Sequence, residues 1–573
     1  MKPLTDDQLA ASHRLVHYIQ HHGIWQHGDQ GRKLRVVFNA SSPTFSGYSL
    51  NDVLHAGPRL QTALPSELLR WRRHRIAFCT DVRMMFHQIL IDERDVDLQR
   101  ILWSSNPKQP PTYYQLLTVT YGASCSPYLS LRVVQQLCED DGRRWPEAVP
   151  VVMNDRYADD VLSGADDIGS AKRLRDQLIG LLQAGGFPLR KWVDSTPELL
   201  EDLPEDVRLR PTWDQLSVGG LVSELGVGWD PPSDFFRSTP PVVESQTTKR
   251  SMLAALAGLF DPCGWLAPIV LNAKLLLQDL WRARLDWDEN VPFSMTRRWT
   301  AFTAELQAIS EFSLPRWIGM SPSSNVQLHV FSDASRRAMA AVVYSWLRSS
   351  DGPALCHILL ARTKLAPIRA HKPMTEPASR MTIPRLELRG ALIAAKLLRS
   401  AASELGVAIE HCHARCDSQI VLHWIRSDQP ANNVLVDNYV AQIQEVLPFS
   451  AWRYLPSQSN PADLATRSAD MSGLRQQPLW WRGPTWLAQD DKSWPQETLP
   501  PPTPTLSLCC AFRAPESDLL QLFSCLRAVL GLLVRVRRWV RHRLQRMPTR
   551  SVLSPLRPSE VQDAFLAKSM LTG

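Results

Sequence analysis

The stretch Tyr157-Ala158-Asp159-Asp160 is the most informative part of this sequence. It lies between two apolar runs, 149–153 and 161–162, which predict the two arms of a β-hairpin. Two adjacent carboxylates at a hairpin tip repel each other, so stability alone does not favour them. Taken by themselves, the two acids are explained as turn residues, because Asp is common in turns.

A second acid follows a strand further upstream. Residues 76–80 are apolar and predict a strand, and Asp81 comes directly after them. If this strand pairs with the hairpin, Asp81 and Asp159 meet at one edge of a sheet, with Asp160 beside them. Carboxylates on rigid strands hold two Mg²⁺ ions, or Mn²⁺ in their place, roughly 3.5–4 Å apart. That spacing serves in-line phosphoryl transfer, so the pattern predicts a two-metal site.

Length and composition limit the classes of protein to consider. With 573 residues the chain exceeds a single core and has room for roughly three or four domains. A hydrophobic content of 44% excludes wholesale disorder, and a net charge of +7 favours an anionic partner such as nucleic acid. No uncharged apolar run reaches the roughly 18 residues of a membrane span, so we expect no stable membrane association. Ten scattered cysteines indicate a reducing, intracellular compartment.

Several blocks, in chain order, resemble the reverse transcriptase of Pao/BEL-type long-terminal-repeat retrotransposons. Residues 157–160 resemble the signature hairpin of its palm. The other blocks are 33–41 and 49–52 (fingers), 121–127 (nucleotide binding), 185–192 (the block after the hairpin) and 225–229 (the primer-grip turn). The resemblance implies that Asp81 and Asp159 are the principal metal ligands and that Asp160 lies closer to the primer end.

The same resemblance assigns substrate contacts. Lys33 and Arg35 would lie against the triphosphate, and Tyr157 would contact the substrate from the hairpin. Phe86 would pack where a ribose 2′-OH must go, which favours deoxynucleotides. Lys191 is a candidate proton donor to the departing pyrophosphate, and a solvated lysine at a helix end is the alternative.

Four further acids stand where strands end or helices begin. The set is Asp333, Glu387, Asp417 and Asp463. Each one alone is explained as a helix cap or a surface carboxylate. As an ordered set they resemble the Asp-Glu-Asp-Asp of the ribonuclease H fold, which implies a second pair of Mg²⁺ ions and hydrolysis of RNA in an RNA–DNA hybrid.

We therefore expect a multidomain α+β or α/β chain. A right-hand polymerase of fingers, palm and thumb would be followed by a ribonuclease H-like mixed sheet. Residues 1–232 would form fingers and palm, and 233–322 a thumb- or connection-like helical region whose two helices break at 261–264. Residues 323–475 would form the ribonuclease H-like domain. Residues 476–573 would be a Pro-rich linker and a basic helical tail.

The resemblance implies an RNA-directed DNA polymerase, a nucleotidyltransferase, with ribonuclease H activity from a retrotransposon polyprotein. Its partners would be RNA template, DNA primer, RNA–DNA hybrid and deoxynucleoside triphosphates, with the protease, integrase and Gag parts of the polyprotein. It would work in the cytoplasm inside a virus-like particle, with nuclear entry as an option. Two alternatives stay open. One is a Pao-type aspartic peptidase, which is disfavoured because the sequence contains neither Asp-Thr-Gly nor Asp-Ser-Gly, the turn that carries the paired carboxylates of such an enzyme. The other is a decayed or domesticated nucleic-acid-binding protein.

Two further segments have competing interpretations. His411, Cys412, His413 and Cys416 resemble a zinc-ligand cluster, but their alternation favours a buried strand. The arginine-rich tail, 535–546, either binds phosphates or an anionic membrane, or is a solvated linker helix.

Overall fold

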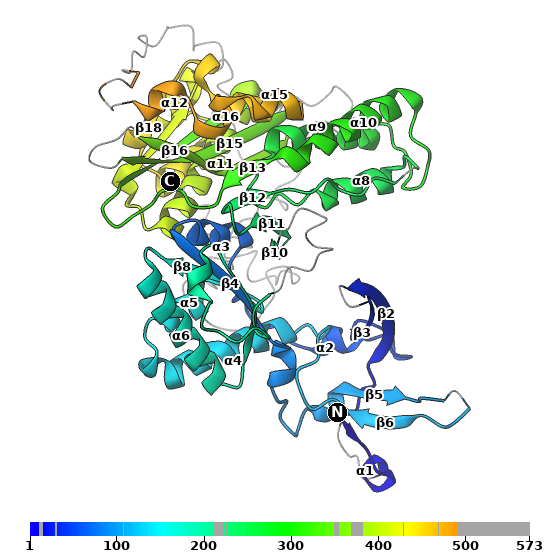
Figure 1. Ribbon diagram of the computed structural model, residues 1–573. Helices are drawn as coiled ribbons and strands as arrows, with labels where there is room; N and C mark the ends of the chain where they lie inside the picture. Colours follow the sequence, from blue (N-terminus) through cyan, green and yellow to red (C-terminus); the bar gives the residue numbers. More distant parts are fainter. Residues whose placement is uncertain are drawn as a thin grey trace, which may run out of the picture. The chain divides into compact units, whose positions relative to one another are not determined.

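The computed structural model contains a sheet for each predicted group of acids, and helices pack on both sheets (Figure 1). It describes residues 1–10, 15–28, 31–106, 108–209, 222–224, 226–244, 246–348, 354–367, 382–427, 429–467, 469–489, 492 and 494–495. The predicted basic tail and most of the predicted Pro-rich linker lie outside these residues. Within them, none of the helices has the length and apolar character that crossing a membrane requires.

The first sheet carries Asp81 and the hairpin. In pairing order its antiparallel strands are β7 (Arg156–Tyr157), β8 (Asp160–Ala165), β4 (Ile76–Val82) and β9 (Leu189–Asp194). Its helices are α4 (Ser126–Asp141), α5 (Ala148–Asn154) and α6 (Ile168–Ala184), which lie together in Figure 1. Phe78 and Trp192 of the sheet share one buried core with Val134 and Leu178 of the helices. The predicted pairing of the 76–80 strand with the hairpin is confirmed.

The run 149–153 is helical, so the prediction of a hairpin arm there was wrong. It belongs to α5, which buries Ala148, Val151 and Val152, a helical spacing, and packs on α4 and α6. A short apolar run fits a strand or a buried helix equally well, and here the neighbouring helices decide between them. The first arm of the hairpin is the short strand β7 instead.

The N-terminal part forms two small antiparallel sheets. One is the hairpin of β2 (Gln20–Gly28) and β3 (Gly31–Asn39); the other pairs β1 (Lys2–Pro3), β6 (Thr112–Gln115) and β5 (Arg100–Trp103). The helices of this part are α1 (Asp6–Ala10), α2 (Leu50–Val53) and α3 (Leu64–Trp71). A small core of Ile19, Ala40, Leu50 and Ile101 joins the two sheets and α2, whereas α3 buries Leu68, Leu69 and Trp71 in the core of the mixed sheet.

The second large sheet is mixed, as predicted. In pairing order its strands are β16 (Leu355–Leu365), β15 (Ala338–Arg348), β14 (Asn325–Ala334), β17 (Cys412–Cys416) and β18 (Trp452–Tyr454). The first three are antiparallel, and β14, β17 and β18 are parallel. Parallel neighbours need a crossover, which α11 (Ile383–Leu405) supplies between β14 and β17. The following helices are α12 (Gln419–Arg426), α13 (Val434–Val446), α14 (Leu464–Arg467), α15 (Met471–Arg475) and α16 (Pro478–Arg482).

Between the two sheets the chain forms a small sheet and three long helices. The strands are β10 (Val222–Glu224), β11 (Val227–Asp230), β12 (Phe235–Arg237) and β13 (Ser313–Pro315); the helices are α8 (Lys249–Gly258), α9 (Ala267–Arg282) and α10 (Phe293–Leu306). The predicted break between two helices at 261–264 is confirmed. These helices share one hydrophobic core with the mixed sheet, while the predicted boundary at 322 and the thumb-like role stay predictions.

Two arginines with no exposed surface connect these parts. The Arg72 guanidinium donates to the carbonyls of Arg316, at 3.0 Å, and Ile358, at 2.8 Å. The Arg316 guanidinium binds Asp234 at 2.6 Å and donates to the Trp71 carbonyl at 2.7 Å. Burial lowers the pKa of Arg72 to about 10, which leaves it charged at neutral pH. These buried guanidinium groups therefore link the end of α3, the strand β13 and the edge strand β16. Removing either group would leave buried partners without a hydrogen bond and would lower the free energy of unfolding.

The turn at 261–264 allows a sharp test of how the helical region is fixed to the mixed sheet. Gly264 has φ +76°, and a Cβ there would run into the carbonyl oxygen of Ala361 on β16. Gly186 has the same φ with nothing within 4 Å of its Cβ position. We expect Gly186→Ala to cost about 1 kcal/mol of unfolding free energy from backbone strain alone. Gly264→Ala should cost roughly 3 kcal/mol or more, because the clash adds to that strain.

Urea unfolding followed by circular dichroism measures both changes. Equal costs for the two variants would contradict the close approach of the turn to β16.

Candidate functional site

The first group of acids lies at one end of β4 and β8. Asp81 is the direct register partner of Asp160 across these strands. The Val82 amide donates to the carbonyl of Asp159 at 2.8 Å. The three acids predicted for the polymerase site therefore meet at one edge of the sheet, and the Asp81 side chain is only 12% exposed.

The hairpin tip is held by two residues that the sequence analysis missed. Ala158 has a left-handed backbone with φ 55°, an uncommon conformation for a residue other than glycine. The buried Arg156 donates to the Ala158 carbonyl at 2.7 Å. The Gln61 amide accepts from the Ala158 amide at 2.9 Å and donates to the Arg156 carbonyl at 3.1 Å. These bonds fix the turn that presents Asp159 and Asp160.

Two cations contact Asp81. Arg190 Nε lies 2.8 Å from Asp81 Oδ1, and Lys191 Nζ lies 2.7 Å from Oδ2. Lys191 is on β9, so the alternative of a lysine at a helix end was wrong. Arg190 was not predicted, although its position beside Lys191 in the sequence is a local signal.

The structure brings one of the two predicted triphosphate residues to the predicted nucleotide-binding block. Arg35 is exposed on β3. Burial raises the pKa of the Tyr121 phenol, and the nearby charge of Arg35 partly offsets that increase, so the two side chains lie close together. The Tyr121 hydroxyl donates to the Val36 carbonyl at 2.7 Å, which fixes the block to β3. Lys33 is also on β3, but its side chain lies outside the described residues.

Tyr157 and Phe86 are half-buried on different elements. Tyr157 ends β7, where it is the register partner of Asp160. Phe86 lies in a 3₁₀ helix, η1 (Met85–Gln88), that follows β4. Both stand within a few residues of the acids along the chain, and their substrate contacts stay predictions.

The second group of acids gathers at one end of the mixed sheet. Asp333 is the penultimate residue of β14, and Asp417 follows its parallel neighbour β17. Glu387 lies in the first turns of α11, and Asp463 ends the 3₁₀ helix η9 (Pro461–Asp463). Helix α11 can approach β14 closely at Gly390, where a Cβ would lie 3.1 Å from the Asp333 carbonyl oxygen.

Each carboxylate of this group has a polar partner of its own. The pairs are Thr466 with Asp333, Ser418 with Glu387 (2.6 Å), Ser457 with Asp417 (2.5 Å) and Arg467 with Asp463 (2.7 Å). Three of these partners are hydroxyls, which orient a carboxylate without neutralising it. The sequence analysis missed all four. Ser418 adjoins Asp417, and Arg467 follows Asp463 by one helical turn, so sequence spacing could have found these two.

The pKa values show that the four acids lie within electrostatic reach of one another. Burial, and then the charges of Asp417 and Asp463, raise the pKa of Asp333 to about 6. Burial and the charge of Asp417 also raise the pKa of Glu387. The same two causes raise the pKa of Asp463, and the charge of Arg467 partly offsets that increase. Asp417 is therefore the common neighbour, and the group concentrates negative charge that a cation would relieve.

Neither group is a finished metal site. Among the residues that the structure describes, no set of three or more His, Cys, Asp or Glu side chains is arranged to hold an ion. Asp81 faces two cations, and most carboxylates of the second group face hydroxyls. Crowded carboxylate oxygens nevertheless suit a hard divalent cation such as Mg²⁺. The residues fit the ion by donor type and charge, and side-chain rotation would be needed to bring their oxygens together.

The cluster at 411–416 is a strand, as favoured over a zinc site. Cys412 and Cys416 lie buried at the two ends of β17. The His413 ring stacks on His329 of β14, with ring centres 4.8 Å apart. Burial lowers the pKa of His413 to about 4, so the ring is neutral and packed in the core.

Comparison with known families identifies part of the chain. Residues 248–418 match the family described as "Pao retrotransposon-like RNaseH-like domain". This stretch of the chain is therefore similar to the Pao retrotransposon type. The matched Pao-type segment runs from the start of α8 to just past Asp417, so it contains three of the four acids of the second group. The predicted ribonuclease H-like fold of the mixed sheet is thereby confirmed. No curated protein matches the sequence.

One solved structure is similar to this chain. It is described as the foamy viral protease-reverse transcriptase dRH in complex with double-stranded DNA. The identity is 12% and the TM-score 0.45, and the match covers 74% of this chain and 63% of that one. The chain thus spans less than two thirds of that protein. A likeness at this level does not establish the fingers, palm and thumb arrangement, which stays a prediction.

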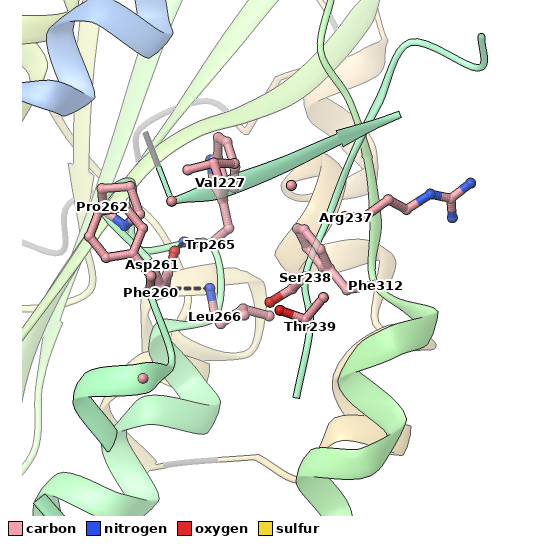
Figure 2. Close-up of a pocket in the computed structure, with 13 residues that line it drawn as sticks. Val227, Arg237, Ser238, Thr239, Phe260, Asp261, Pro262, Trp265, Leu266 and Phe312 are labelled. Carbon is pink, nitrogen blue, oxygen red and sulfur yellow. Dashed lines mark hydrogen bonds between the residues drawn. The ribbon is translucent and has the colours of Figure 1, made fainter. Parts of the chain in front are cut away.

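A pocket lies between the β11–β12 hairpin and the turn before α9 (Figure 2). Its lining includes Val227, Arg237, Phe260 and Asp261. Burial raises the pKa of Asp261 to about 6. Its carboxylate accepts hydrogen bonds from the amides of Trp265 and Leu266, both at 2.8 Å, and so holds the turn that precedes α9. Asp261 is therefore committed to the fold, which leaves it unsuited to be one of a peptidase's paired acids.

The shared charge of the second group can be tested by removing its common member. Asp417→Asn deletes one negative charge, so it should lower the pKa of Asp333, of Glu387 and of Asp463 together. Titration in the presence of a chelator, followed by NMR of ¹³C-labelled carboxyl groups, measures the three values.

Asp176→Asn, which removes a carboxylate paired with Arg175 on α6, is the control and should leave the three values unchanged. Unchanged values in Asp417→Asn as well would contradict the convergence of the four acids.

Proposed function

We propose that this Pao-type chain is an RNA-directed DNA polymerase joined to a ribonuclease H, both parts of a retrotransposon polyprotein. The observation that carries the proposal is the gathering of acids at two separate sheet edges. Asp81 and Asp160 face each other across β4 and β8, and Asp333 shares the field of Asp417 and Asp463 on the mixed sheet. Paired clusters of carboxylates are costly for a fold, so a function is the better explanation.

In the polymerase site, Asp81 and Asp159 would bind the cations and Asp160 would lie nearest the primer end. The braced hairpin presents the last two acids from a fixed turn, which pre-organises them at no further cost during the reaction. Bound divalent cations would supply the charge that stabilises the attacking and leaving oxygens of nucleotidyl transfer. Phe86 and Tyr157, next to the acids along the chain, would position the deoxynucleotide, and Lys33 and Arg35 would approach its triphosphate.

In the ribonuclease H site, Asp333, Glu387, Asp417 and Asp463 would hold the cations. The hydroxyls of Thr466, Ser418 and Ser457 would keep three of these carboxylates in place without reducing their charge. The same type of phosphoryl chemistry, with water as the nucleophile, would cut the RNA strand of a hybrid.

The expected partners follow from this chemistry. RNA template, DNA primer and RNA–DNA hybrid are polyanions, which suits a chain with a net charge of +7. Deoxynucleoside triphosphates would be the substrates. Other parts of the polyprotein, such as protease, integrase and Gag, would accompany the chain in a cytoplasmic virus-like particle.

The two sites can be separated by exchanging one acid in each. Asp159→Asn should lower primer extension on an RNA template with Mg²⁺ by roughly a thousandfold, since a lost metal ligand removes several kcal/mol of transition-state stabilisation. Hybrid cleavage by this variant should be unchanged. Asp333→Asn should show the opposite pattern. Gel assays on one purified preparation of each variant measure both activities.

Each variant serves as the folding control of the other, because each should keep one activity. Equal primer extension by wild type and Asp159→Asn would reject the polymerase assignment, and normal hybrid cleavage by Asp333→Asn would reject the second site. Absence of both activities in the wild-type chain, with nucleic-acid binding retained, would favour a decayed or domesticated protein.

A further inference from the structure

An irregularity in the pairing of β9 directs the neighbouring side chains of Arg190 and Lys191 to the Asp81 carboxylate. In the pairing of β4 with β9, Cys79 faces Val193 and Asp81 faces Arg190. One residue of β4 therefore stands opposite two residues of β9, which is a β-bulge. Successive side chains of a regular strand point to opposite faces. The bulge interrupts that alternation, so both Arg190 and Lys191 reach the Asp81 carboxylate.

The bulge stores backbone strain. Lys191 has φ 55°, in the left-handed region that side chains with a Cβ seldom adopt. The Thr80 hydroxyl donates to the Arg190 carbonyl at 2.9 Å and holds the irregular segment in place. Strain at a functional edge indicates that the geometry it produces has a use beyond folding.

Two cations share the Asp81 carboxylate. Arg190 and Lys191 each contact one of its oxygens, and Asp159 and Asp160 lie at the same edge of the sheet. The two side chains are 39% and 52% exposed, whereas that of Asp81 is 12% exposed. The cations thus cover the acid and are themselves open to solvent. Arginine and lysine together suit phosphate oxygens, which accept forked hydrogen bonds from the first and a point charge from the second.

We propose that Arg190 and Lys191 form a two-cation clamp. The clamp holds Asp81 in the nucleotide-free protein, and it moves to the phosphate oxygens of an incoming nucleoside triphosphate when Asp81 turns to a divalent cation. This inference rests on the proposed polymerase function and adds Arg190 to its substrate-binding residues.

Metal affinity without nucleotide tests the clamp directly. The full chain carries Asp333→Asn to weaken the second site, and Mn²⁺ alone is titrated while its free concentration is followed by electron paramagnetic resonance. Arg190→Gln and Lys191→Met should each bind Mn²⁺ about two- to fivefold tighter than this parent, because a half-exposed ion pair no longer competes for Asp81. Asp81→Asn should lose the site.

A second readout separates the clamp from a merely structural role. In primer extension, Arg190→Gln should raise the KM for deoxynucleoside triphosphate about tenfold with a smaller change in kcat, since a phosphate contact is lost. Arg190→Lys, which keeps the charge, should bind Mn²⁺ as the parent does. Arg173→Gln, which removes an exposed arginine paired with Glu147, is the matched control and should change neither quantity.

The outcomes of the Mn²⁺ titration distinguish a failure of the clamp from a failure of the proposed polymerase function. If Asp81→Asn binds Mn²⁺ as tightly as the parent, no metal binds at this edge, and the polymerase proposal fails together with the clamp. If Asp81→Asn loses Mn²⁺ while Arg190→Gln and Lys191→Met bind it no tighter than the parent, the clamp is overturned and the polymerase proposal stands.

Discussion

The electrostatic cost that this fold has to offset is the repulsion between the carboxylates of the two groups of acids. Acids gather at the ends of two sheets, and like charges at such distances destabilise a fold unless something offsets them. The first group is offset by Arg190 and Lys191 on Asp81. In the second group, hydroxyls orient three of the acids, and burial followed by the charges of neighbouring acids raises the pKa values of Asp333, Glu387 and Asp463. The first edge thus has two cations against its three acids, and the second has Arg467, paired with Asp463, against four.

Hydrogen bonds and close packing fix the backbone around both groups of carboxylates. The hairpin tip is fixed by Arg156 and Gln61, and α11 is brought to β14 by a glycine at position 390. Between the sheets, Arg72 and Arg316 donate to backbone carbonyls from sites without solvent exposure. Removing one of these buried donors would leave several carbonyl acceptors unpaired, which costs free energy of unfolding. These contacts therefore help to fix the parts of the chain that they join.

The Pao-type segment shows how a helical region becomes part of a sheet domain. The Ala361 amide donates to the Cys263 carbonyl at 2.7 Å, and the Trp265 indole donates to the Leu359 carbonyl at 2.9 Å. The turn at 261–264 thereby covers the edge strand β16, which would otherwise expose unpaired backbone groups. The family match, which begins at 248 and runs into the sheet, agrees with this shared packing.

Several local features could be predicted from the sequence: the strands that carry Asp81 and Asp333 next to their last residues, the break at 261–264 and the order of the acids. Periodicity and chain order carry that information, since they depend only on neighbours along the chain. Tertiary structure alone decided that 149–153 is a helix, because packing on α4 and α6 selects between two conformations that the apolar run permits equally. It also decided which groups contact the acids. Gln61 lies far in sequence from the hairpin backbone that it binds, and Thr466 lies far from Asp333, so only long-range packing places these two side chains. A bulge in the pairing of β4 with β9 brings Arg190 to Asp81.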